Sequence, residues 1–136
     1  MYVRFVCPRQ HPYTDAELGI YRATDWLDVE DQPEWLCRDY ERALESMEGL
    51  SVPRCVSGSS GTADGRRSLC WLRGERDDLV SGFRHLAWVM GEMGVPVSEI
   101  VMRDPGHIIY RDDAQVVALP GPGLPRAYPR KWAARV

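Results

Sequence analysis

The stretch Ile100–Pro120 (IVMRDPGHIIYRDDAQVVALP) decides the fold class of this chain. In Asp104-Pro105-Gly106-His107, proline presets the φ angle of the second turn position, and glycine accepts the positive φ that follows. Ile108–Tyr110 and Val116–Val117 are β-branched or aromatic, as strands prefer. The four residues between them, Arg111-Asp112-Asp113-Ala114, suit a short hairpin loop. The stretch therefore predicts three short strands in an antiparallel meander.

The segment before this stretch predicts a strand and then an amphipathic helix. Ser68–Arg73 has strand-like composition, and Asp77 and Asp78 would favour the positive end of a helix dipole. Five apolar residues then recur at steps of four and three: Leu79, Phe83, Leu86, Met90 and Met93. Gly94 ends the helix. A strand, helix and strand in this order predict a β-α-β crossover.

The first half of the chain predicts one strand and two helices. Tyr2–Val6 reads as a strand that Pro8 ends. Thr14-Asp15-Ala16-Glu17 matches a capping box, which predicts a helix to about Val29. Pro33 is suited to the first position of a second helix. Because the link is short, we expect the two helices to form an antiparallel pair.

These elements predict an α+β fold in the order β-α-α-loop-β-α-β-β-β. We expect a mixed sheet of about five strands with three helices packed on one face. Residues 1–120 would form a single globular domain, with a flexible Ser/Gly-rich loop at 54–67. Residues 121–136 would form a Pro-rich basic C-terminal tail.

Composition limits the class of protein to which this chain can belong. The chain has 136 residues, a net charge of −3 and 44% hydrophobic residues, which fits one globular domain. Its four cysteines, Cys7, Cys37, Cys55 and Cys70, show no Cys-x-x-Cys or zinc-finger spacing, so we expect free thiols, no metal and no cofactor. No apolar run approaches the roughly 20 residues of a membrane span. We therefore expect a cytoplasmic protein without membrane contact.

Charge is divided unevenly along the chain. Between Tyr13 and Leu50 eleven acids face three arginines, a balance of −8. From Gly121 to the end there are four bases and no acid, a balance of +4. Two tryptophans fall off the apolar stripes of their helices and would be interface anchors. The binding candidates are Trp35, Trp88, Glu41, Glu45, Arg66, Arg67, Arg130, Lys131 and Trp132.

A polar set around the two turns offers weak candidates for catalysis. His107 beside Asp112 could act as a general base, with Arg103 nearby. Arg66 and Arg67 border the glycine-rich loop, which resembles a phosphate-binding loop in composition only. A phosphate loop needs a helix after it, whereas a strand follows here. The basic tail could bind nucleic acid, but the acidic helices would repel phosphate, which argues against that partner.

The sequence therefore predicts a small binding protein of the inhibitor, adaptor or immunity type. Its acidic helical face would contact a basic site on a protein partner or form a homodimer. The alternative is a small enzyme with a polar site near His107 and Arg66-Arg67. Such an enzyme would act on a phosphate-containing or nucleotide substrate.

Overall fold

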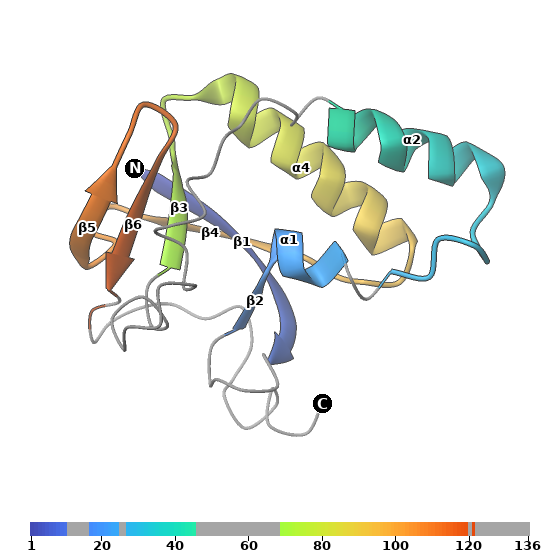
Figure 1. Ribbon diagram of the computed structural model, residues 1–136, viewed down its shortest axis with the longest axis horizontal. Coiled ribbons are helices and arrows are strands. Elements are labelled where there is room, and N and C mark those ends of the chain that lie inside the picture. Colours follow the sequence, from blue (N-terminus) through green and yellow to red (C-terminus); the bar gives the residue numbers. More distant parts are fainter. Residues whose placement is uncertain (11–16, 25–26, 46–68, 120, 122–136) are drawn as a thin grey trace.

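A computed structural model describes residues 1–10, 17–24, 27–45, 69–119 and 121 (Figure 1). Its elements are β1 (Tyr2–Gln10), β2 (Glu17–Gly19), α1 (Ile20–Ala23), α2 (Glu34–Glu45), β3 (Leu69–Arg73), α4 (Asp77–Glu92), β4 (Ser98–Met102), β5 (His107–Arg111) and β6 (Gln115–Leu119). The α+β class is confirmed. The expected loop at 54–67 and the tail lie outside the described residues, apart from Gly121, and the domain bounds stay a prediction.

All strand pairs in the sheet are antiparallel, so the expected mixed sheet is wrong. Five strands follow the order β4-β1-β3-β6-β5, and the three-residue β2 pairs with the second half of β1. Residues Tyr2 and Val3 pair with β4 on one edge and with β3 on the other. The crossover through α4 therefore joins two strands that run parallel, but β1 lies between them and is antiparallel to both.

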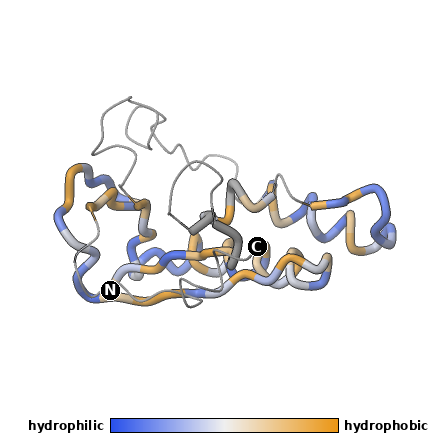
Figure 2. Tube along the Cα trace, turned by 90° about the horizontal axis from the view of Figure 1, so that it is seen from below, coloured by the Kyte–Doolittle hydropathy of each residue, from blue (hydrophilic) through white to orange (hydrophobic). Residues whose placement is uncertain are grey.

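Helices cover one face of this sheet. Val3, Phe5 and Cys7 of β1 point toward α4, where they share a core with Phe83 and Leu86. The rings of Phe5 and Phe83 stack with centroids 5.7 Å apart. Helix α2 lies on α4 (Figure 1), and Leu36 packs there against Val89 and Met93. In Figure 2, hydrophobic and hydrophilic stretches alternate along the trace, as amphipathic elements require.

The opposite face of the sheet carries a second apolar cluster. Val6, Trp71, Ile100, Val116 and Ala118 form it, and all five are at least nine-tenths buried. Alternation along β1 explains this arrangement, because successive side chains of a strand point to opposite faces. The sheet is thus apolar on both sides.

The expected first helix is wrong over most of its described length. Residues 11–16, which include most of the capping box, lie outside the described part; Glu17–Gly19 form β2, and α1 is a single turn. Of three expected helices, two are longer than one turn, and α2 packs on α4 rather than on the first helix. The cause is nonlocal, because β2 obtains its hydrogen bonds from the far end of β1. That strand continues past Pro8 to Gln10, and an irregular register between Cys7 and Gln10 accommodates the proline.

The β5–β6 hairpin agrees with the expectation, but the three-stranded meander is wrong, because β4 pairs with β1 at the opposite edge of the sheet from β5. Gly106 has φ = 106°, as the turn chemistry requires, and its N–H donates to Oδ1 of Asp104 at 3.0 Å. Strand β5 pairs with β6, and a register shift between Ile108 and Tyr110 leaves one extra residue on β5. None of the described helices is long and apolar enough to cross a membrane.

Candidate protein-binding surface

Helix α2 presents an acidic outer side because its apolar residues face α4. The helix begins after Pro33, whose carbonyl accepts hydrogen bonds from the N–H groups of Leu36 and Cys37 at 3.0 and 3.1 Å. Leu36 and Ala43 are buried. At 3.6 residues per turn, the residues on the other side face outward. These are Glu34, Glu41 and Glu45, all of them exposed.

The loop before α2 adds further carboxylates. Asp28, Glu30 and Asp31 are exposed. A side-chain hydrogen bond with Asp28 and the negative charge of Asp28 raise the pKa of Asp31, because both favour the protonated form of Asp31. Together these residues define the acidic surface: Asp28, Glu30, Asp31, Glu34, Asp39, Glu41 and Glu45. Residues 27–45 hold these seven acids and two arginines, a balance of −5.

Both arginines on α2 are already engaged. Arg38 bonds Glu34 at 2.6 Å, and Arg42 approaches Asp39 at 3.8 Å. The remaining five acids form no ion pair within the described residues. Glu41 and Glu45 also lie one turn apart, where like charges destabilise a helix. The acidic surface therefore carries five carboxylates that no ion pair within the described residues neutralises.

Two tryptophans are exposed beside this surface. Trp35 on α2 is 55% exposed and Trp88 on α4 is 51% exposed, whereas Trp71 is 1% exposed. His85 stacks on Trp88 with ring centroids 6.3 Å apart and planes 19° apart. The expectation that Trp35 and Trp88 lie off the packed stripes therefore fits the structure. Trp132 lies outside the described residues.

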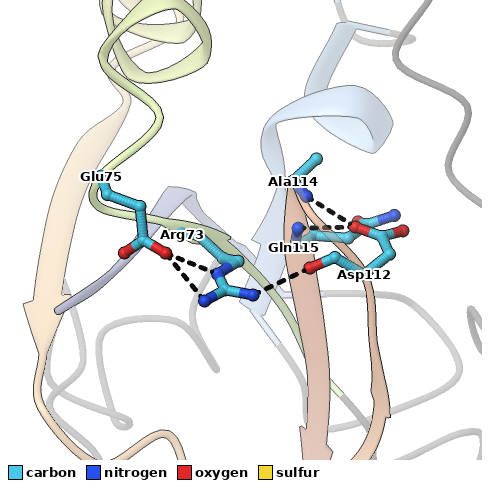
Figure 3. Close-up of polar contacts among 5 residues, drawn as sticks. All are labelled: Arg73, Glu75, Asp112, Ala114 and Gln115. Atoms are coloured by element: carbon cyan, nitrogen blue, oxygen red, sulfur yellow. Dashed lines mark hydrogen bonds and ion pairs between the residues drawn. The ribbon is translucent and has the colours of Figure 1, made fainter.

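The polar set at the β5–β6 turn has a structural explanation. Oδ1 of Asp112 accepts hydrogen bonds from the N–H groups of Ala114 and Gln115, both at 2.8 Å, and Oδ2 accepts one from the Tyr110 hydroxyl at 3.0 Å. Arg73 lies between Glu75 and the backbone oxygen of Asp112 (Figure 3). Burial opposes ionisation of Asp112, but these hydrogen bonds outweigh it and lower its pKa. Asp112 thus holds the turn as a carboxylate.

The catalytic candidates are not brought together. His107 and Arg103 are exposed, and within the described part neither forms a hydrogen bond or ion pair with Asp112. A general base needs an oriented partner within hydrogen-bonding distance. Arg66, Arg67, Arg130 and Lys131 lie outside the described residues. Among the described residues, His107, Arg103 and Asp112 therefore form no hydrogen-bonded group, and their catalytic role stays a prediction.

The described cysteines form no disulfide with one another. They are Cys7, Cys37 and Cys70, and Cys55 lies outside the described residues. Burial raises the pKa of Cys70, against a smaller opposing effect of Arg4, which disfavours the reactive thiolate. No group of three or more His, Cys, Asp or Glu residues in the described ranges could hold a metal ion.

Sequence reasoning identified both exposed tryptophans, Glu41 and Glu45, but missed three neighbours of the indoles. One of them is His85, which stacks on Trp88 in an exposed position. Asp39 and Glu92 each follow a tryptophan by four residues. That spacing was visible in the sequence and would have placed each acid beside an indole.

Comparison with protein-family models, curated proteins and solved structures finds no match to this chain. Its function must therefore be inferred from its own residues.

Proposed function

We propose that this protein is a small binding protein of the inhibitor or adaptor type, whose acidic surface contacts a basic site on another protein. The observation that carries the proposal is the group of exposed carboxylates without a cation partner in the described chain. The charge of Asp28 opposes ionisation of Asp31, and Glu41 and Glu45 repel each other along α2. A basic partner would relieve both repulsions on binding.

The charge also favours particular classes of partner. Phosphate groups would be repelled by this surface, which argues against a nucleic acid. A symmetric homodimer through the same patch would bring acid against acid, because an isologous interface repeats one surface on both subunits. A different protein with a basic site remains as the partner that the surface fits.

Affinity capture from native lysate with two matched double variants tests this proposal. Glu41→Gln with Glu45→Gln removes two charges from the acidic surface. Asp77→Asn with Asp113→Asn removes two exposed charges elsewhere, on α4 and the β5–β6 turn. We expect the wild type and the second variant to retain the same basic protein, and the first variant to release it at lower salt.

Equal retention by the two double variants would contradict the proposal, because it would mean that the acidic surface does not form the contact. So would a retained partner whose binding does not weaken as salt increases. Circular dichroism of both variants confirms that the comparison is made between folded proteins.

A further inference from the structure

The two exposed tryptophans lie at the same end of the helical layer. Trp35 precedes Leu36, and Trp88 precedes Val89; Leu36 and Val89 belong to one packed cluster between α2 and α4. Packed helices lie 8–10 Å apart, so the two indoles are separated by a distance on the order of 10–15 Å. Both are about half exposed. They therefore form a pair on the outer surface of one helix–helix contact.

Each indole has a carboxylate one helical turn away. Asp39 follows Trp35 by four residues on α2, and Glu92 follows Trp88 by four residues on α4. Residues four apart share one face of a helix. The same two-residue combination thus occurs on both helices, at the same end of their contact.

Among the described residues, two arginines near these indoles pair with acids outside the two combinations. Arg38, three residues after Trp35, bonds Glu34 at 2.6 Å. Arg84, four residues before Trp88, makes a bidentate pair with Glu99 of β4, with contacts of 2.8 to 3.1 Å. Arg42 approaches Asp39 itself at 3.8 Å, which is longer than a hydrogen bond, so a cation from outside could displace this contact. Glu92 forms no ion pair within the described residues.

We infer that this surface binds an arginine-bearing segment of the partner protein. One guanidinium would stack on Trp35 and donate to Asp39, and another would stack on Trp88 and donate to Glu92. Arginine fits better than lysine, because its planar guanidinium stacks on an indole while its N–H groups reach a carboxylate. This inference rests on the proposed function and specifies the chemistry of the partner.

The separation of the indoles sets the spacing of the arginines. An extended segment advances about 3.3 Å per residue, so two arginines about three or four residues apart would reach both sites. A suitable probe is an acetylated and amidated peptide with two arginines separated by three alanines. The matched lysine peptide has the same charge but lacks the guanidinium plane.

Titration of 15N-labelled protein with each peptide tests the inference through the indole N–H resonances. We expect the arginine peptide to shift the signals of Trp35 and Trp88 while the signal of buried Trp71 stays in place. Trp35→Leu or Trp88→Leu should weaken binding about two- to five-fold, and Trp88→Phe should recover part of the loss. Ile109→Ala, an exposed apolar position on β5, is the control and should leave affinity unchanged.

Equal affinity for the two peptides, together with no effect of either leucine variant, would overturn the arginine inference. Absence of any shift at Trp35 and Trp88 would do the same. Neither outcome decides the proposed function, since capture by the Glu41 and Glu45 variant tests it with residues outside both indole sites. Failure of capture with intact peptide binding would instead refute the proposed function alone.

Discussion

Replacement of Asp112 tests whether its carboxylate stabilises the β5–β6 turn. The Asp112 carboxylate accepts three hydrogen bonds, two from backbone N–H groups and one from Tyr110. A hydrogen bond of this kind contributes about 0.5–1 kcal/mol net in a half-exposed turn. Asp112→Ala should therefore lower the free energy of unfolding by about 1.5–3 kcal/mol at pH 7.

Two further variants make this measurement specific. Asp112→Asn keeps one oxygen that can accept the backbone N–H groups, and we expect it to lose only about 1 kcal/mol. Asp113→Ala alters the exposed neighbour, which makes no hydrogen bond or ion pair within the described chain, and it should stay within about 0.5 kcal/mol of the wild type. Urea denaturation followed by circular dichroism gives all three values.

The pH dependence supplies an independent check. Folding lowers the pKa of Asp112, so its ionised form stabilises the protein above the unfolded-state pKa of about 3.9. This contribution is lost as the pH falls through the lower folded-state pKa. The difference between wild type and Asp112→Asn should be constant near neutrality and shrink below about pH 4. A loss no larger for Asp112→Ala than for Asp113→Ala, or a difference unaffected by acid, would refute the argument.

Three other substitutions test the fold. Gly106→Ala should destabilise the protein by at least about 2 kcal/mol, because a side chain is strained at this positive φ and would clash with the carbonyl of Leu119. Urea denaturation measures this loss. Gly91→Ala should raise the free energy of unfolding by about 0.5–1 kcal/mol in the same urea experiment, since its added methyl group would meet open space on α4. Glu99→Gln should lower the melting temperature slightly by releasing Arg84, and 1 M salt should reduce the difference.

Local chemistry predicted the elements whose stabilising contacts are close in sequence. Gly106 specifies the turn before β5, and residues 112–114 specify the turn of the β5–β6 hairpin, both by local backbone geometry. The stripe from Leu79 to Met93 specifies α4, and all five of its residues are buried. In both cases the hydrogen bonds and the buried side chains belong to one short segment.

Pairing between strands that are distant in the sequence determined the parts of the fold that local patterns did not predict. Glu17 has the spacing of a capping box, yet it pairs with Gln10 on β1. The antiparallel sheet likewise depends on β1 lying between β3 and β4, which no local pattern records. For the candidate binding surface, the sequence predicted which tryptophans and acids would be exposed. Their assembly at one end of the α2–α4 contact required the helix packing.

The central place of β1 has a consequence for synthesis of the protein on the ribosome. This strand is made early, but its pairing with β4 requires residues up to Met102. At about 5–20 residues per second, β1 would wait on the order of 5–20 s for that partner. During this interval Phe5 and Val6, which end in the two opposite cores, would remain available to chaperones. Protection of β1 from aggregation is therefore needed until β4 has been synthesised.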